Sequence, residues 1–267
     1  MRFIQGFFMS FGMFCAIPCP YRPWNEKARN LMVSFLPVVG LVIGILWYLL
    51  YLAVEKLGLP LQLQTACLML YPFLVTGFIH LDGYMDTSDA ILSRRPLEEK
   101  LRILKDPHTG AFAVISLAVL FIICFASVLA VLENIHFETA LGMQETNPIF
   151  SLILIPAITR CCSALVVLKG KPLSHSQYGG EFHQDKKIGE AIFILIVGLL
   201  CFTAAIAAGF REKGFSYAII AVLLVAVLTY IVSILYAKKQ LGGVSGDLAG
   251  YAMTLAEAGA MVAMALI

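Results

Sequence analysis

Three aspartates in one short polar stretch are the residues whose types and spacing best fit chemistry. Asp82, Asp86 and Asp89 lie in the segment 80–110, between two long apolar runs, and no Lys or Arg follows them before Arg94. In a helix, steps of four and three residues would put the three carboxylates on one face, within roughly 60° of one another. Carboxylates that close repel each other unless a cation binds them, and hard oxygen ligands favour Mg²⁺ or Mn²⁺. The spacing therefore predicts a divalent-metal site shared with a substrate phosphate.

The same stretch allows a simpler interpretation, in which basic residues neutralise the acids in a solvated loop. The candidates for that role are Arg94, Arg95, Lys100, Arg102 and Lys105. His80 would lie about 160° from Asp82 around such a helix, so it is a weak candidate for a shared metal ligand. It is expected either as a general base that contacts substrate or as a hydrogen-bonded structural residue.

A turn ends the polar stretch at Lys105-Asp106-Pro107-His108-Thr109-Gly110. Pro107 and Gly110 are typical turn residues, so a purely structural loop before the next helix is one interpretation. In the functional alternative, Lys105 and His108 donate to a phosphate and Asp106 joins the metal site.

A second glycine-rich segment, 242–250, precedes the last apolar run and contains Ser245 and Asp247. Glycines at a helix start let backbone N–H groups approach an anion. Asp247 is then either a metal or ribose ligand or, in the structural alternative, the helix cap.

Arg160 interrupts an otherwise apolar run, where an unpaired charge is costly. Its partner is expected to be a substrate phosphate or one of the acids named above, and an interior structural ion pair is the alternative. Glu257 raises the same question in the last run.

Composition places the whole chain in a membrane. Of its 267 residues 60% are hydrophobic and 13% are charged, against about 45–50% and 25% in soluble domains. The net charge of +2 gives no indication of nucleic-acid binding. Most of the seven cysteines fall in apolar runs without a CxxC pair, so neither disulfides nor a zinc site is predicted.

The apolar runs predict an all-α, polytopic integral membrane helical bundle in a single domain, 1–267. About seven transmembrane helices are expected, at 31–54, 60–80, 111–131, 148–168, 190–209, 216–236 and 248–267. Gly40 and Gly44 in the first run predict close helix packing. Residues 1–20 resemble a signal peptide in layout, but retention as an N-terminal interfacial or re-entrant segment is favoured.

Positive charges predict the orientation of the bundle. Alternate loops hold 15 of the 19 Lys and Arg residues, and the intervening loops hold only Lys56, Arg211 and Lys213. Because such loops face the cytoplasm, the acidic stretch and the loops 169–189 and 237–247 are expected there. Transporters more often bury their ionisable groups near the midplane, so this asymmetry favours an enzyme with cytosolic substrates.

The motifs together resemble a known family. His80-x-Asp82-Gly83-x-x-Asp86-Thr87-x-Asp89-Ala90, Lys105-Asp106-x-x-x-Gly110 and Gly242-Gly243-x-Ser245-Gly246-Asp247 are similar to the signatures of the cobalamin synthase (adenosylcobinamide-GDP ribazoletransferase) family. The chain departs from that pattern at Ser245, where Thr is usual, and at His108, near which Arg is often found. The run 91–95 also replaces a glycine-rich segment.

The resemblance implies a multi-pass enzyme of the cell inner membrane. It would transfer the adenosylcobinamide phosphate moiety from adenosylcobinamide-GDP to α-ribazole or its 5′-phosphate, release GMP and require Mg²⁺. The expected metal ligands are Asp82, Asp86, Asp89 and Asp106; the catalytic residues are Asp82, Asp86, His80 and Lys105; the substrate contacts are Gly83, Thr87, Arg160, Gly243, Ser245, Gly246 and Asp247. A homo-oligomer is left open. The alternatives are a CDP-alcohol phosphotransferase, whose acid spacing is longer, and an ion-coupled transporter.

Overall fold

A computed structural model describes residues 2–141, 148–173, 188–211 and 214–267. These segments are almost entirely helical, as the sequence predicts. The helices are α1 (Arg2–Phe14), α2 (Arg29–Ser34), α3 (Leu36–Lys56), α4 (Leu61–Val75), α5 (Ile79–Leu92), α6 (Leu97–Ile103), α7 (Ala111–Ala140), α8 (Ser151–Lys169), α9 (Ile188–Gly209), α10 (Ala218–Leu241) and α11 (Gly246–Leu266). Two short strands, β1 (Phe210–Arg211) and β2 (Gly214–Phe215), form a hairpin between α9 and α10.

Six helices in the described part of the chain are long and apolar enough to cross a membrane: α3, α7, α8 with the turn before it, α9, α10 and α11. The pair α4 and α5 would add a seventh span if it crosses as one broken element. The protein is therefore an all-α, multi-pass membrane bundle, which confirms the predicted fold class.

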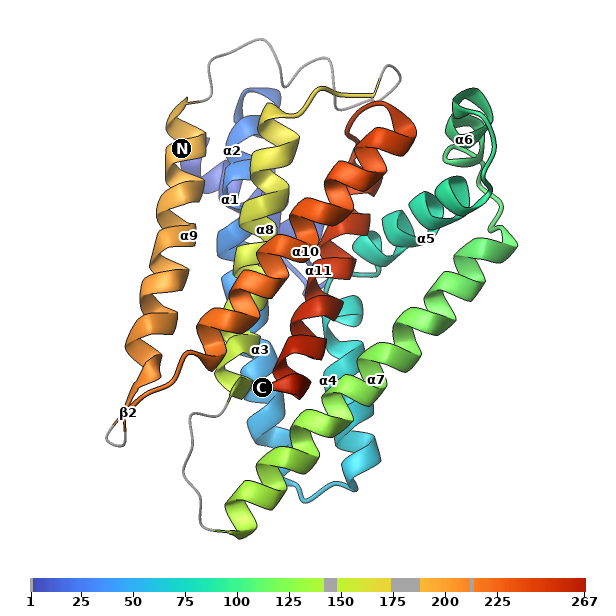
Figure 1. Cartoon of the computed structure of the whole chain (residues 1–267). Coiled ribbons are helices and arrows are strands. Elements are labelled where there is room, and N and C mark those ends of the chain that lie inside the picture. Colours follow the sequence, from blue (N-terminus) through green and yellow to red (C-terminus); the bar gives the residue numbers. More distant parts are fainter. Residues whose placement is uncertain (1, 142–147, 174–187, 212–213) are drawn as a thin grey trace.

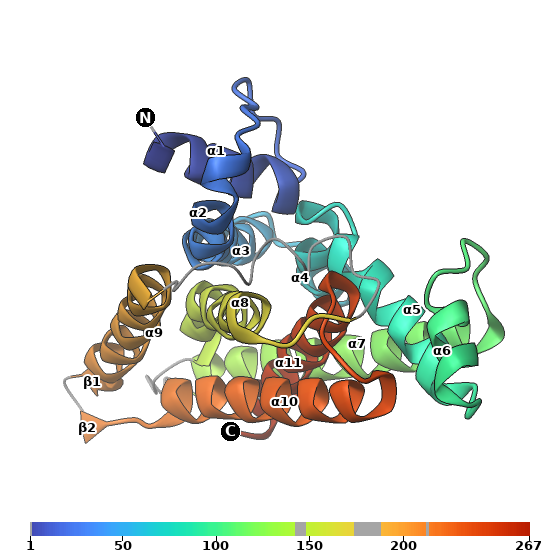
Figure 2. The same cartoon turned by 90° about the horizontal axis from the view of Figure 1, so that it is seen from above.

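Helix α11 lies at the centre of the bundle and packs against α5, α7, α8 and α10 (Figures 1 and 2). Helices α3 and α8 make another extensive contact. Gly40 and Gly44 permit it, since a Cβ at either position would overlap the α8 backbone at Pro156 or Ile153. The predicted close packing is confirmed, and Pro37 lies in the first turn of α3, where proline is tolerated.

The predicted span 60–80 is wrong at its carboxyl end. Helix α4 ends at Val75, and the chain turns by 88° before α5 begins at Ile79. Gly77 and Phe78 both have positive φ, 61° and 63°. The left-handed conformation at two consecutive residues cannot continue a right-handed helix. The continuous apolar run gave no sign of this break.

Helix α1 is too short to span a bilayer. It packs on α2 and α3, and the Ala16 N–H that follows it donates to the Val75 carbonyl at 2.7 Å. The amino-terminal segment therefore lies against the α4–α5 break.

One end of the bundle collects the polar segments. The α5–α6 arm, the carboxyl ends of α8 and α10 and the start of α11 all lie at the end drawn at the top of Figure 1. This arrangement agrees with the loop grouping inferred from positive charges.

Candidate functional site

Asp82, Asp86 and Asp89 project from α5 at the polar end of the bundle. The predicted helix through them is confirmed. Asp82 is exposed, and Asp86 and Asp89 are half-buried. The turn before α5 directs this helix away from the axis of α4, which brings the carboxylates beside the start of α11 (Figure 1).

A fourth carboxylate, Asp247, joins the three from α11. A Cβ at Gly83 would lie 2.8 Å from the Asp247 Cα and carbonyl oxygen, so α5 approaches α11 through this glycine. The negative charges of Asp82, Asp247 and Asp89 all act on Asp86. We call Asp82, Asp86, Asp89 and Asp247 the acid cluster.

Gly110 lies directly against the Asp89 carboxylate of the acid cluster. It immediately precedes α7 with extended backbone angles, φ −83° and ψ 167°. A Cβ at this position would overlap the Asp89 carboxylate. The glycine that sequence analysis assigned to a turn therefore also leaves room for an acid of the cluster.

The acid cluster has no ion pair with Lys, Arg or His among the residues that the structure describes. Arg102 binds Glu99 instead, and the Lys100 ammonium donates to Gln240 at 2.6 Å. The described structure thus gives no support to neutralisation of these acids by the neighbouring basic residues. Lys186 and Lys187 lie outside the described residues, as do the other polar residues of 174–187.

A preformed metal cage is absent from the described ranges, since no three His, Cys, Asp or Glu side chains there are grouped closely enough to hold an ion. The donor set nevertheless suits Mg²⁺, which usually keeps several waters and takes only one or two carboxylates together with substrate phosphates. Unpaired carboxylates at an accessible surface fit that mode of binding.

Asp106, predicted as a further metal ligand, has a local partner. Its Oδ1 accepts the His108 backbone N–H at 3.0 Å and lies 2.6 Å from His108 Nδ1. These hydrogen bonds lower the pKa of the Asp106 carboxyl below its ordinary value, and the one from the His108 backbone has the larger effect. Both residues are exposed, as is Lys105, so this turn is held by its own side chains.

The glycine-rich segment forms the start of α11. Ser245, rather than Asp247, is the N-cap: its Oγ accepts the Leu248 N–H at 3.3 Å and donates to Asp247 Oδ2 at 3.3 Å. Gly243 packs on Leu173, whose N–H donates to the Val244 carbonyl. Hydrogen bonds therefore connect the segment after α8 to this loop. The Asp247 carboxylate remains close enough to Asp86 for their charges to interact.

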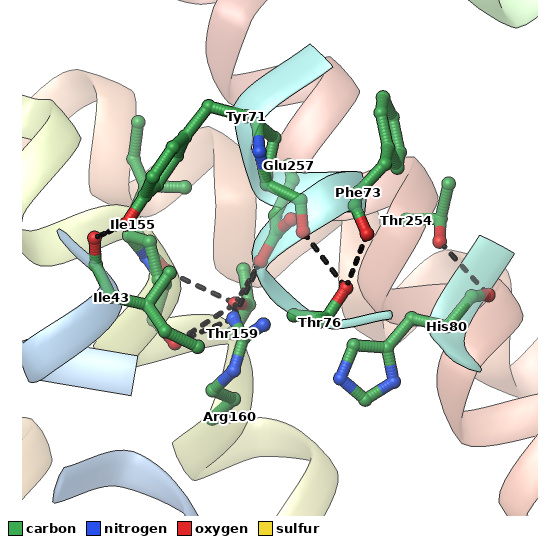
Figure 3. Close-up of polar contacts among 12 residues, drawn as sticks. Ile43, Tyr71, Phe73, Thr76, His80, Ile155, Thr159, Arg160, Thr254 and Glu257 are labelled. Carbon is green, nitrogen blue, oxygen red and sulfur yellow. Dashed lines mark hydrogen bonds and ion pairs between the residues drawn. The ribbon is translucent and has the colours of Figure 1, made fainter. Parts of the chain in front are cut away.

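Arg160 and Glu257 form a buried ion pair between α8 and α11. The Arg160 guanidinium lies 2.7 Å from Glu257 Oε1, and the two residues are 1% and 7% exposed. Thr159 donates to the same carboxylate oxygen, and Arg160 also donates to the Pro156 carbonyl. Figure 3 shows these side chains converging inside the bundle. The interior ion pair was the structural alternative for Arg160.

His80 lies in the first turn of α5. Its carbonyl accepts the Thr254 hydroxyl (Figure 3) and its backbone contacts Gly250 of α11. Its Nε2 is buried without a hydrogen-bond partner in the described structure. Thr87 is fully buried in the helix packing.

The His80 ring lines a pocket of about 240 Å³ that also reaches Ser245, Gly246 and Asp247. Other parts of its wall come from α1, α2, the start of α3, α8 and the segment that follows α8. The sequence did not indicate that α1 contributes to the pocket. An apolar segment of that length resembles a membrane-surface helix, and its residues do not show which helix it packs against.

Comparisons with known proteins agree with these motifs. The family model described as cobalamin-5-phosphate synthase matches residues 6–265. The chain is similar to proteins named adenosylcobinamide-GDP ribazoletransferase: 37% identical to one from Clostridium perfringens (strain SM101), covering 96% of this chain and 95% of that protein; 37% to one from Clostridium botulinum (strain Alaska E43), covering 95% and 94%; and 30% to one from Lachnoclostridium phytofermentans, covering 96% and 92%. No solved structure gave a significant match.

Proposed function

The chain belongs to the cobalamin-5-phosphate synthase family and is an enzyme of cobalamin biosynthesis, and from that premise we propose its reaction. The adenosylcobinamide phosphate portion of adenosylcobinamide-GDP is transferred to α-ribazole or its 5′-phosphate, and GMP is released. The names of the relatives supply the two substrates.

The observation that carries the proposal is the acid cluster. Four carboxylates from α5 and α11 gather at the polar end without an ion pair to any described basic side chain. A diphosphate repels such a cluster unless divalent cations accompany it. The cluster would hold Mg²⁺, mainly through Asp82 and Asp86, and bound Mg²⁺ would neutralise charge on the diphosphate as GMP leaves.

The chemistry required of the chain itself is mostly positioning. In phosphoryl transfer, alignment of the acceptor oxygen with the leaving oxygen and stabilisation of charge supply most of the catalysis. A ribose hydroxyl of the acceptor forms a bond to the phosphorus nearest the cobinamide, and the bond from that phosphorus to the oxygen of GMP breaks. Asp247 belongs both to the pocket lining and to the acid cluster, which supports a role for it in contacting that hydroxyl and taking up its proton.

Two residues receive roles that differ from their first interpretation. Arg160 ties α8 to α11 through Glu257, so its contribution is support of the site rather than phosphate binding. The ring of His80 faces the pocket, so a binding role suits it better than that of general base. Lys105 is exposed beside Asp106 and remains the candidate cation for the donor's phosphates.

The active site is expected to face the cytoplasm, because the loops at the polar end carry most of the basic residues.

Release of GMP by purified protein tests the proposal. The reaction contains adenosylcobinamide-GDP, α-ribazole and Mg²⁺, and separate controls omit each component. Formation of GMP and the corrinoid product only in the complete mixture supports the assignment. Release of CMP at a comparable rate when a CDP-alcohol replaces the donor, or GMP release without acceptor, contradicts it.

A further inference from the structure

The pocket beside the acid cluster has two chemically different ends. Met13, Phe14, Met32 and Leu36 line one end and are all apolar. At the other end lie Ser245 and Asp247, at the start of α11. Such a pocket fits a ligand with a flat apolar part and a hydroxyl-bearing part, and Asp247 in its lining belongs to the acid cluster that the reaction uses.

Two aromatic rings in the pocket are suited to a planar group. The Phe14 ring and the His80 imidazole are nearly parallel, with an interplanar angle of 14° and centroids 6.3 Å apart. Offset stacking on such rings is favourable for a flat heteroaromatic ligand. The unpartnered Nε2 of His80 adds a further reason for a ligand, because leaving a buried polar atom without a hydrogen bond is unfavourable.

We propose that this pocket binds the base of the acceptor nucleoside and directs its ribose toward Asp247. The inference rests on the proposed function, which supplies the acceptor. The base of α-ribazole is 5,6-dimethylbenzimidazole, a two-ring group with two methyl substituents and one free ring nitrogen. Its dimethyl edge suits the apolar end, and its ribose then reaches the acid cluster.

Size and polarity separate this occupant from the other parts of the substrates. A volume of about 240 Å³ lies below the range of about 300–1,000 Å³ typical of sites for drug-sized ligands, so the macrocycle of cobinamide does not fit. Guanine is of suitable size but carries several donors and acceptors along its edge. Against Met13, Met32 and Leu36 these groups would lose their hydrogen bonds to water without replacement.

Narrowing the pocket should weaken acceptor binding alone. Val167 of α8 lines the pocket, and Val167→Phe adds bulk to its wall. We expect the KM for α-ribazole to rise by at least about tenfold, the scale on which apolar pockets discriminate small groups, with the KM for the donor changed by less than about threefold. Val232→Phe, at a 66% exposed position on α10, is the matched control and should leave both values unchanged.

A smaller base should recover what Val167→Phe loses. The riboside of unsubstituted benzimidazole lacks both methyl groups, so its kcat/KM relative to that of α-ribazole should increase in Val167→Phe by about tenfold or more. A general disturbance of the fold would lower both values together and leave their ratio at the wild-type level. An unchanged ratio overturns the proposal, as does a Val167→Phe enzyme in which only the KM for the donor rises, since the guanine would then occupy the pocket.

Binding of free 5,6-dimethylbenzimidazole, measured by equilibrium dialysis without donor or Mg²⁺, separates this inference from the proposed function. Saturable binding to the wild type and to Val232→Phe, at least about tenfold weaker in Val167→Phe, supports the pocket even if no GMP is released. Equal binding by all three proteins refutes the pocket even where turnover is normal.

Discussion

At the scale of single residues, two glycines leave the space that the side chains of the acid cluster occupy. Gly83 allows Asp247 to approach Asp82 and Asp86, and Gly110 leaves space for the Asp89 carboxylate. The glycines of the two motifs are therefore part of the geometry of the acids. Substitutions at the acids and at these glycines should have different effects.

Asp86 lies under the influence of all three other acids, so its loss should affect the reaction most directly. Asp86→Asn keeps the shape of the side chain but removes its charge. GMP release should fall by at least about 100-fold, as expected when an electrostatic group of the site is removed, while the amount of protein in the membrane stays normal. Glu98→Gln, which neutralises an exposed acid on α6, is the control and should retain wild-type activity.

Gly110→Ala should damage the site and spare the fold. The three atoms nearest the added Cβ belong to the Asp89 carboxylate, a side chain that can rotate away, and the backbone at 110 is compatible with alanine. We expect kcat to fall by about 10–100-fold, because small misplacements of catalytic groups have effects of that order. The unfolding temperature in detergent should not change. Equal kcat values for Gly110→Ala and the neighbouring control Thr109→Ala would show that the position of Asp89 is unimportant.

At the scale of helices, the site depends on how closely α5 and α8 approach α11. The Gly83 contact is with the backbone of Asp247, which cannot rotate out of the way. Gly83→Ala should therefore separate α5 from α11 and destabilise the protein by about 1–3 kcal/mol, as overpacking does, with loss of activity. Gly189→Ala is the matched control, because a Cβ at this position meets no atom. Thermal unfolding that is identical in both variants would contradict the close approach.

The Arg160–Glu257 pair joins α8 to α11. Removing the pair shows whether Arg160 stabilises the fold or binds the substrate. Arg160→Met leaves Glu257 buried and unpaired, a change that typically costs about 3–5 kcal/mol, so the yield of folded protein should fall. The double variant Arg160→Met with Glu257→Met removes both charges and should recover most of that yield. If the pair is structural, the recovered protein has a KM for the donor within about threefold of wild type. A rise of about tenfold or more would mean that Arg160 binds the substrate.

The helices were predictable from the sequence where apolar character alone defines them. Spans such as α9 and α10 follow from their length and composition, and the helix through Asp82, Asp86 and Asp89 follows from spacing. The break between α4 and α5 was not predictable, because Phe78 adopts the left-handed region in spite of its bulk. Backbone hydrogen bonds hold that turn, from the Gly77 N–H to the Leu74 carbonyl and from the Phe78 N–H to the Phe73 carbonyl. The partner of Arg160 was likewise open, since Glu257 is distant in sequence and helix spacing does not tell which buried charges meet.

At the scale of the whole molecule, the polar segments meet at one end of the bundle and the opposite end carries few Lys and Arg residues. This asymmetry explains how an enzyme embedded in lipid could bind a diphosphate and a nucleoside from water. The pocket joins the amino-terminal helix α1 to the start of α11, so the first and last helices of the chain share one site.

Reporter fusions test the orientation of this end. Alkaline phosphatase fused after Lys105, behind α6, should stay in the cytoplasm and remain inactive, because the loop there is basic. Fusion after Glu138, near the end of α7, should be exported and active. The reverse pattern would place the acid cluster on the outer side and contradict access from the cytosol.

Metal binding at the acid cluster tests the central claim most directly. Mn²⁺ replaces Mg²⁺ at oxygen-rich sites and can be followed by electron paramagnetic resonance in purified protein with adenosylcobinamide-GDP and without acceptor. We predict donor-dependent Mn²⁺ binding by the wild type that is weakened at least about tenfold when Asp82 and Asp86 are both replaced by Asn. Equal Mn²⁺ binding by the two proteins would contradict the account.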